Sequence, residues 1–519
     1  MTLPTIPRTI LPGLILVIGF CWRVYAASLT FLNPDELLHL YFSLPSGLMA
    51  SASEFGHPPF FYWILHLVSA VSTSRWALRA LPLLAGTIGP FLVYRWLSAL
   101  GYPRAGLVAM AMLSLSPNLV LLSAQTRGYE IAAALAAWAL VLTEQALANS
   151  LTSVLLLPVV LAAGIFTEYA QFSFLAGLGI YTLIRGLQLR PGIRFWSLWA
   201  ASQVLVLLAC WWLYRNVIQV ELARPMFQFR ADTYLAVAFP LPGQSPLVFL
   251  ALGTTRQFAY LMSSKFLGVL SLLPFGTGLV LFWIRPAEAV QAKPSNGIMP
   301  GRAVVAAAVT ALLLAMGAGL QGLYPYGRTR HAATLCVLLA AVTAYGLERI
   351  LGDRPRTVVA AVLALLLMWP RLSSPDPNNI DPKRGGYRAT WSAANGLHKL
   401  LTPGIIILTD QETALILRYA WRRDRPVPSV THAEGTSEWI LDGAHVLWRR
   451  WDFGNARWLQ EDAAAVRALY HIDPGTPLLL ADGGFNADAA KDLLARFGPG
   501  LFLESAGGAI YVLPSPPAF

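Results

Sequence analysis

The chain has 519 residues, of which 56% are hydrophobic and only 13% carry a charged side chain. Soluble globular proteins carry about 25% charged residues, so this composition excludes an ordinary soluble protein. Apolar runs of roughly 17–22 residues recur through the first part of the sequence, and this length is typical of helices that cross a bilayer about 30 Å thick. The sequence therefore predicts an integral membrane protein.

The net charge of +11 is unevenly distributed along the chain. Residues 1–372 contain 24 basic and 11 acidic side chains, whereas residues 373–519 contain 14 and 16. The basic excess belongs to the apolar part, where loop arginines that set membrane topology explain it. No basic patch with interleaved aromatic residues indicates a nucleic-acid partner. The three cysteines lie inside apolar runs, which predicts small buried side chains and no disulfide framework.

Eleven membrane spans are expected before residue 372. They lie near residues 9–29, 78–97, 104–123, 129–148, 151–168, 170–187, 195–214, 266–284, 303–322, 331–348 and 356–371. We expect the first span to be an uncleaved anchor whose N-terminus is cytoplasmic, because most arginine-bearing short loops then follow the positive-inside rule. Residues 57–74 are also apolar, but counting them as a span would reverse this arrangement. Their prolines, histidines and aromatic side chains favour a helix that lies in the membrane interface.

The composition changes at Ser373, where a Pro-, Asn- and Gly-rich linker begins. Strands are expected at GIIILTD, HVLWRRW, TPLLLAD and AIYVLP, and helices at QETALILRYAWR and NADAAKDLLARFG. This alternation predicts a small soluble α/β domain over residues 373–519, which follows a transmembrane catalytic domain over residues 1–372. The expected topology places the C-terminal domain on the extracytoplasmic side.

Candidate functional residues occur in the segments that this topology places outside the cytoplasm. Asp35 and Glu36 follow the first span in the sequence NPDE. Two interpretations stay open: the carboxylates stabilise the first turn of a helix that begins at Asn33 or Pro34, or they face a cavity and take part in chemistry. His57 precedes two prolines that restrict the backbone, so it belongs to a surface turn or is held rigidly beside these carboxylates.

Two further segments carry positive charge on the same side. Arg127 and Tyr129 lie in QTRGY, where the arginine either extends toward lipid headgroups or binds a phosphate with its planar guanidinium. Arg328, Arg330 and His331 lie in YPYGRTRH, which is either a chance cluster of charge or a site for a phosphate or diphosphate.

Glu168, in FTEYAQF, lies at a hairpin tip between two expected spans. It is either simply solvated or part of the same site. Taken together, these segments bring carboxylates that could accept a proton and cations that could hold a phosphate to one surface of the bilayer. This combination indicates transfer from a lipid-linked phosphate donor to an acceptor outside the membrane.

The order of four motifs resembles the GT-C glycosyltransferases, and most of all the branch that contains protein O-mannosyltransferases and bacterial lipid A aminoarabinose transferases. Asp35-Glu36 is similar to the family's acidic motif, and His57-Pro58-Pro59 to its HPP motif. Residues 79–82 (RALP) and 123–129 (SAQTRGY) resemble two later elements. The likeness is good over residues 9–150 and looser over 150–350. At FTEY, relatives often have Thr-His-Tyr, so Glu168 stands where a histidine is common.

This resemblance implies a GT-C-like, α-helical polytopic membrane fold. It also implies an inverting hexosyl- or pentosyltransferase that uses a polyprenyl-phosphate sugar donor and a lipid, glycan or protein acceptor. The matching first-loop carboxylates make Asp35 the first candidate for the general base and Glu36 the second. The residues assigned to the donor phosphate are Arg127, Arg328, Arg330 and His331, and those assigned to supporting the site are His57, Tyr129 and Glu168. A bacterial inner-membrane location is expected.

Other interpretations remain open on the sequence alone. No metal or other cofactor is predicted, although the carboxylates and His57 could together hold Mg²⁺ or Mn²⁺, which prefer oxygen ligands. A multi-span transporter or lipid flippase is the alternative function, but no internal repeat supports it. A non-catalytic subunit, with the C-terminal domain as a partner-binding or acceptor-shaping module, is the third possibility.

Overall fold

The computed structural model describes most of the chain before residue 352 and the central elements of the region after it. The described residues are 10–29, 32–44, 57–223, 235–284, 300–327, 329–351, 403–409, 411–422, 429–431, 436–441, 443–449, 468, 471, 473, 478–482, 501–502 and 509–513. The chain forms two compact units. The first comprises Met1–Ala27, Phe42–Leu67 and Leu78–Ser373, and the second comprises Ser28–Tyr41, Val68–Ala77 and Ser374–Phe519.

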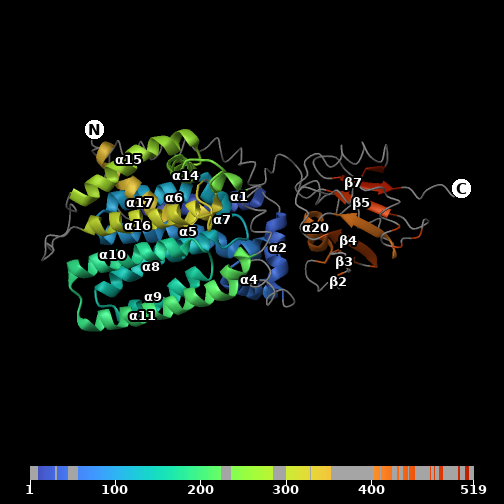
Figure 1. Ribbon diagram of the computed structural model, residues 1–519, viewed down its shortest axis with the longest axis horizontal. Helices are drawn as coiled ribbons and strands as arrows, with labels where there is room; N and C mark the ends of the chain where they lie inside the picture. The colour runs from blue at the N-terminus through green and yellow to red at the C-terminus, as the bar shows by residue number, and fades with distance from the viewer. Residues whose placement is uncertain are drawn as a thin grey trace. The chain divides into compact units, whose positions relative to one another are not determined.

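Helices make up the described part of the chain before residue 352, as the apolar runs predict (Figure 1). They are α1 (Ile10–Leu29), α2 (Pro34–Ser43), α4 (Phe60–Val71), α5 (Arg75–Ala99), α6 (Pro103–Leu115), α7 (Pro117–Ser123), α8 (Tyr129–Leu147), α9 (Leu151–Ile165), α10 (Gln171–Leu189), α11 (Ile193–Leu213), α12 (Gln219–Leu222), α14 (Pro246–Leu261), α15 (Lys265–Ile284), α16 (Pro300–Leu320) and α17 (Ala333–Leu351). A π-helical turn, Tyr214–Ile218, joins α11 to α12. Short 3₁₀ turns lie at Ala236–Ala238, before α14, and at Arg330–Ala332, directly before α17.

The protein is an integral membrane protein. Among the described residues, eight helices are long and apolar enough to cross a bilayer, or nine if the bent pair α6–α7 is one span. Ten of the eleven expected spans coincide with helices, although α9 has only 15 residues, and the expected span 356–371 lies outside the described residues. Helix α4 has 12 residues and so is about 18 Å long, which is too short to cross the bilayer. This length agrees with the expectation that residues 57–74 do not form a membrane span.

Helices α6 and α7 replace the single span expected over 104–123, and they meet at an angle of 61°. Pro117 has no N–H to donate, so the Leu113 carbonyl loses its helical partner. Arg23 of α1 compensates by donating to the carbonyl oxygens of Ser114 (2.6 Å) and Leu113 (3.3 Å). The Asn118 N–H donates instead to Ser263 Oγ at 2.9 Å. The break is therefore a satisfied structural feature that redirects the chain toward Gln125–Tyr129.

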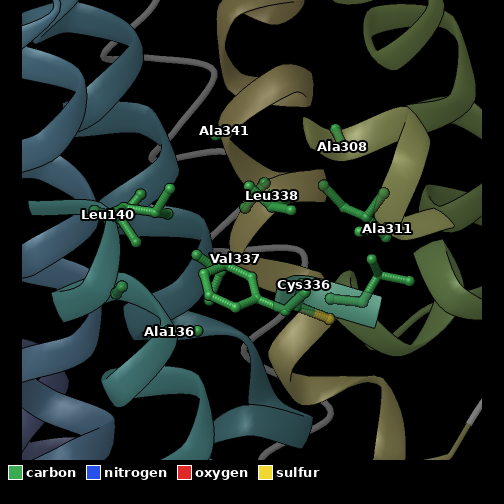
Figure 2. Close-up of a cluster of buried hydrophobic side chains, with 14 of the residues drawn as sticks. Ala136, Leu140, Ala308, Ala311, Cys336, Val337, Leu338 and Ala341 are labelled. Atoms are coloured by element: carbon green, nitrogen blue, oxygen red, sulfur yellow. The ribbon is translucent and has the colours of Figure 1, made fainter. Parts of the chain in front are cut away.

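Small residues allow the helices of the bundle to approach closely. Figure 2 shows Ala308, Ala311, Ala341 and Ala136 among larger side chains such as Leu338 on neighbouring helices. A Cβ atom added at Gly346 of α17 would lie 1.7 Å from the Pro274 carbonyl oxygen of α15, so only glycine fits there. Such contacts hold helices together in lipid, where the hydrophobic effect offers little. Of the cysteines, Cys336 is buried as expected, whereas Cys21 is exposed on α1.

The C-terminal part of the second unit is a mixed sheet of seven strands with helix α20 (Gln411–Arg422). The strands are β1 (Ile406–Thr409), β2 (Ser429–Thr431), β3 (Thr436–Leu441), β4 (Ala444–Arg449), β5 (Leu478–Asp482), β6 (Leu501–Phe502) and β7 (Ala509–Leu513), in the order β2-β3-β4-β1-β5-β7-β6. The central strand β1 pairs in parallel with β4 and β5, and the remaining pairs are antiparallel.

The predicted α/β character of this region is confirmed. All four expected strands and the helix QETALILRYAWR are present, whereas the expected helix over 486–498 lies outside the described residues. The hairpin of β2 and β3 was not expected, because SVTHAEGTSEWIL alternates hydrophobic and polar residues less regularly than the central strands. Residues 28–41 and 68–77 also belong to this unit, which the sequence did not indicate.

Candidate functional site

Helix α2 carries the acidic pair Asp35 and Glu36, and it begins with a reciprocal capping arrangement. Asn33 is the N-cap and Pro34 the first helical residue. The Glu36 N–H donates to Asn33 Oδ1 at 2.9 Å, and the Asn33 N–H donates to Glu36 Oε2 at 2.9 Å. These two bonds form a capping box that satisfies two backbone donors at the helix start. Glu36 is buried in this role, while Asp35 is partly exposed and takes no part in the reciprocal pair.

A second polar feature lies at the turn between α9 and α10, where Glu168 is buried. Tyr324 donates its hydroxyl hydrogen to Glu168 Oε1 at 2.7 Å. The same hydroxyl lies 3.2 Å from His331 Nδ1, and Nδ1 is 3.5 Å from Glu168 Oε1. Since the hydroxyl hydrogen is engaged with Glu168, Nδ1 of His331 carries the hydrogen in this arrangement, which leaves Nε2 of a neutral ring as an acceptor.

Tyr129, at the start of α8, joins this cluster from the other side. Its ring packs edge-on against the His331 ring, with centroids 5.3 Å apart. Arg330 Nε donates to the Tyr129 hydroxyl at 3.0 Å, and the Arg330 guanidinium lies 5.8 Å from the centroid of the Tyr129 ring. The short 3₁₀ turn before α17 therefore delivers both Arg330 and His331 to one place.

Arg127 lies in the turn that leads into α8, and its side chain is only 3% exposed. It interacts electrostatically with the Tyr129 hydroxyl and with the His331 ring, as Arg330 also does. Gly128 holds this turn against its neighbour, because a Cβ atom there would lie 3.0 Å from the side chain of Thr167. The turns that contain Arg127 and Glu168 are thus in direct contact.

The HPP segment reaches the same place through the backbone. The Phe60 N–H, just after Pro58 and Pro59, donates to the Phe166 carbonyl oxygen at 2.8 Å. Burial raises the pKa of the Glu168 carboxyl, but hydrogen bonds from His331 and Tyr324, together with electrostatic attraction to His331 and His57, outweigh this effect. The pKa of Glu168 therefore lies below its usual value of 4.5, and the group is a carboxylate at neutral pH.

The first unit thus brings six of the predicted site residues together: His57, Arg127, Tyr129, Glu168, Arg330 and His331. We call them, together with Tyr324, the polar cluster. Tyr324 was not among the predicted site residues, although it opens the quoted segment YPYGRTRH. Asp35 and Glu36 belong to the second unit, and Arg328 lies outside the described residues. The solvated hairpin tip proposed as an alternative for Glu168 does not occur, because this side chain is 8% exposed.

The described part of the chain contains no assembled set of metal ligands. No three His, Cys, Asp or Glu side chains gather there in a way that could hold a metal ion. Within the polar cluster, the one carboxylate is already engaged with a tyrosine hydroxyl and a histidine. The arrangement is suited instead to an anion, because two arginines accompany the single carboxylate.

Residues 56–214 match the family model described as dolichyl-phosphate-mannose-protein mannosyltransferase. Among solved structures, the chain is similar to ArnT from Cupriavidus metallidurans bound to undecaprenyl phosphate, with a TM-score of 0.58 and 13% sequence identity over 96% of this chain and 97% of that chain. The apo state of the same protein matches with a TM-score of 0.55 and 12% identity over the same shares. The chain has a GT-C fold.

A weaker likeness links the GT-C fold of this chain to the archaeal oligosaccharyltransferase AglB from Archaeoglobus fulgidus in complex with an inhibitory peptide and a dolichol-phosphate. The TM-score is 0.42 and the identity 12%, over 79% of this chain and 63% of that chain. Direct sequence comparison finds no match among curated proteins.

The predicted resemblance to the branch of GT-C glycosyltransferases that includes ArnT is confirmed. The sequence match over residues 56–214 and the similarity to ArnT thus agree on a GT-C membrane fold. The matched range includes the segments of His57, Arg127 and Glu168, but it begins after Asp35 and ends before Tyr324. The catalytic and binding roles of all the predicted site residues, inside and outside this range, remain predictions.

Proposed function

We propose that this chain is an inverting glycosyltransferase that moves a sugar from a polyprenyl-phosphate donor to an acceptor on the extracytoplasmic face of the bacterial inner membrane. The observation that carries the proposal is the polar cluster, in which Arg127 and Arg330 surround a histidine and two tyrosines while Glu168 is the one carboxylate. The likeness to ArnT, whose structure was solved with undecaprenyl phosphate, supports the class of donor.

The excess positive charge of the arginines could stabilise the leaving phosphate in such a reaction. As the glycosidic bond breaks, negative charge develops on the phosphate oxygen that leaves with the polyprenol. Guanidinium groups in low-dielectric surroundings stabilise such charge, because solvent screens them little. Arg127 is buried and Arg330 is half-buried. Arg330 and Arg127 are the proposed phosphate ligands, with Arg328 and His331 beside them in sequence. Tyr129 orients Arg330 through the 3.0 Å hydrogen bond.

Asp35 is the proposed general base. It accepts the proton of an acceptor hydroxyl while the acceptor oxygen bonds to the anomeric carbon, and the bond from that carbon to the phosphate oxygen breaks with its electron pair. Polyprenyl phosphate is a stable leaving group, so no second carboxylic acid is needed to protonate it. Glu36 is the weaker candidate, because its oxygen accepts the Asn33 N–H in the capping box.

The proposed reaction places no demand for a metal, since arginine supplies the positive charge at the phosphate. Turnover is therefore expected to stay within about twofold when a chelator is added. A purified enzyme that loses most of its activity on chelation, and recovers it with Mg²⁺ or Mn²⁺, would overturn this part of the proposal.

The test uses the purified full chain in lipid nanodiscs with polyprenyl-phosphate sugars, and it measures glycoside product and released polyprenyl phosphate. Asp35→Asn is expected to lower turnover by about 10²–10⁴-fold, the usual contribution of a general base. Glu36→Gln, which keeps the capping box, tests the second candidate in parallel and is expected to stay near wild-type turnover if Asp35 is the base. Undiminished turnover of Asp35→Asn would exclude Asp35 as the base, and donor flux without glycoside product would indicate a transporter instead.

A further inference from the structure

The second unit joins two regions that lie far apart in sequence. Helix α2, in the N-terminal part of the chain, and helix α20, in the C-terminal part, contribute to the same compact unit. Their contact centres on Arg418 of α20. The guanidinium carbon of Arg418 lies 4.5 Å from the centroid of the Tyr41 ring on α2 and 4.8 Å from the centroid of the Trp439 ring on β3.

This contact is buried and specific in its chemistry. Arg418 is 9% exposed and Trp439 only 1%. Burial lowers the pKa of Arg418, since a charged guanidinium loses hydration there. A side-chain hydrogen bond and an electrostatic interaction with Tyr41 oppose this effect. The faces of the two aromatic rings also stabilise the guanidinium, because a cation stacks favourably on a π system and does so most strongly when it is desolvated. The side chain of Arg418 is therefore held in one position between the two rings, unlike that of a surface arginine.

The neighbouring residue of α20 makes a second contact with the N-terminal part of the chain. The Tyr419 hydroxyl donates to the Thr73 carbonyl oxygen at 2.7 Å, in the turn between α4 and α5. Consecutive residues of a helix point about 100° apart, so Arg418 and Tyr419 hold two different segments. Residues 28–41 and 68–77 are thus anchored to the C-terminal region by adjacent side chains of one helix.

Helix α2 transmits the contact to its own acidic end. Tyr41 and Asp35 are six residues apart on a helix of ten residues, a rise of about 9 Å. The capping box at Asn33 and Glu36 holds the first turn in helical geometry. A helix that is capped at one end and stacked on Arg418 at the other has little freedom to rotate, so the direction of the Asp35 side chain follows from where α20 holds Tyr41.

We propose that Arg418 is a positioning residue, and that the C-terminal α/β region fixes the orientation of α2, and so of Asp35, through the stack of Tyr41, Arg418 and Trp439. The region is then needed for transfer although it contributes no atom to the reaction. The catalytic part of this proposal rests on the proposed function, whereas the mechanical part, that Arg418 holds α2, does not.

Hydrogen–deuterium exchange of the full chain in nanodiscs tests the mechanical part without any substrate. In Arg418→Met and in Tyr41→Leu, exchange of the amides of 36–43 is expected to rise at least about tenfold. Tyr41→Phe keeps the ring but loses the hydroxyl that interacts with Arg418, so a smaller rise is expected for it. His445→Ala, on the sheet but outside the stack, is the matched control. Unchanged exchange in α2 for both Arg418→Met and Tyr41→Leu, with β1 and β4 still protected, would overturn the proposal.

Steady-state kinetics tests the catalytic part. Arg418→Met is expected to lower kcat about 10–100-fold with the KM for the donor within twofold, and Arg418→Lys, which keeps a cation, to recover part of the loss. Faster exchange in α2 with unchanged kcat would overturn the catalytic role, as would a loss confined to KM. If the wild-type chain shows no transfer at all, the proposed function fails, and the exchange data alone decide whether Arg418 holds α2.

Discussion

Polar clusters with similar kinds of side chain but different charge balance lie at the two ends of α8. Tyr129 in its first turn and Glu144 near its last are 15 residues apart, a rise of about 22 Å. At the Glu144 end, Arg185 donates to both carboxylate oxygens, at 2.8 and 2.7 Å, and Tyr181 donates to the same carboxylate. The Trp96 indole N–H in turn donates to the Tyr181 hydroxyl at 2.9 Å.

Both ends of α8 are polar, so the balance of charge distinguishes the candidate site from a structural ion pair. At the Glu144 end one guanidinium meets one carboxylate in a bidentate pair, which satisfies both groups and leaves little net charge for a ligand. In the polar cluster, Arg127 and Arg330 accompany Glu168. Glu130, the other acid at this end of α8, interacts electrostatically with a further arginine, Arg23, so positive charge is still in excess among the described residues. The balanced end is expected to stabilise the fold, and the unbalanced end to bind an anion.

The largest expected effect is at the balanced end. Arg185→Met leaves Glu144 buried without its cation, which costs about 3–5 kcal/mol of stability. Thermal unfolding in detergent measures the loss. The double variant Glu144→Leu with Arg185→Met is expected to recover most of it, because an apolar pair of similar volume is often neutral. A single variant as stable as wild type would contradict the structural role.

Arg330→Ala is expected to act in the opposite way, with a large effect on turnover and a small one on stability. Loss of one donor that stabilises developing charge usually lowers kcat by about 10²–10³-fold. Arg302→Ala is the matched control. Like Arg330, Arg302 stacks on an aromatic ring and donates one hydrogen bond, in its case to a backbone carbonyl, but it lies outside the polar cluster. Equal turnover in Arg330→Ala and wild type would remove Arg330 from the proposed phosphate site.

The stability that Glu168 contributes is expected to depend on pH. Its pKa is lower in the folded state, so its contribution to stability is complete above its unfolded value near 4.5 and is lost as the pH falls through the folded pKa. Glu168→Gln is therefore expected to be less stable than wild type at pH 7 by about 1.5–3 kcal/mol, the worth of hydrogen bonds to a charged group. The two proteins should converge on acidification, and a constant difference in Tm from pH 7 to pH 3 would show that the carboxylate charge is not the cause.

The smallest effects come from two matched tyrosines, each of which donates a hydroxyl to a buried carboxylate. Tyr181→Phe is expected to cost about 1–2 kcal/mol of stability with kcat unchanged. Tyr324→Phe is expected to cost a similar amount and also to lower kcat severalfold, because the Tyr324 hydroxyl positions Glu168 and His331. The same kinetic result in both variants would mean that the two ends do not differ in function.

Local patterns predicted much of this architecture. Apolar length was enough to place the spans, because a helix in lipid must be both long and apolar, and the buried central strands stood out as continuous apolar runs. The capping box could also have been predicted from Asn33 and Glu36, three residues apart. Helix α14 was missed because Thr254, Thr255 and Arg256 interrupt its apolar surface.

Contacts between distant residues could not be predicted. Tyr324 and Glu168 are 156 positions apart, and no local signal pairs them. The membership of α2 in the same unit as α20 depends on Tyr41 and Arg418, whose residue types alone suggest an ordinary surface tyrosine and a charged helix face. Such placements follow from the path of the whole chain, which no short segment of the sequence encodes.

The break between α6 and α7 has a consequence for how the chain enters the membrane. Arg23 lies inside the first span, where an arginine costs about 2.5–3.5 kcal/mol of insertion free energy at the helix centre. Its best acceptor, the Ser114 carbonyl, is 91 residues further along the chain. Within α1 itself Arg23 donates only to the Gly19 carbonyl, at 3.1 Å. During synthesis, α1 therefore enters the bilayer without the Ser114 and Leu113 acceptors until α6 is made. Stable integration of the first helix is then coupled to a segment made much later, so truncation before Ser114 is expected to release α1 from the membrane more readily than truncation after it.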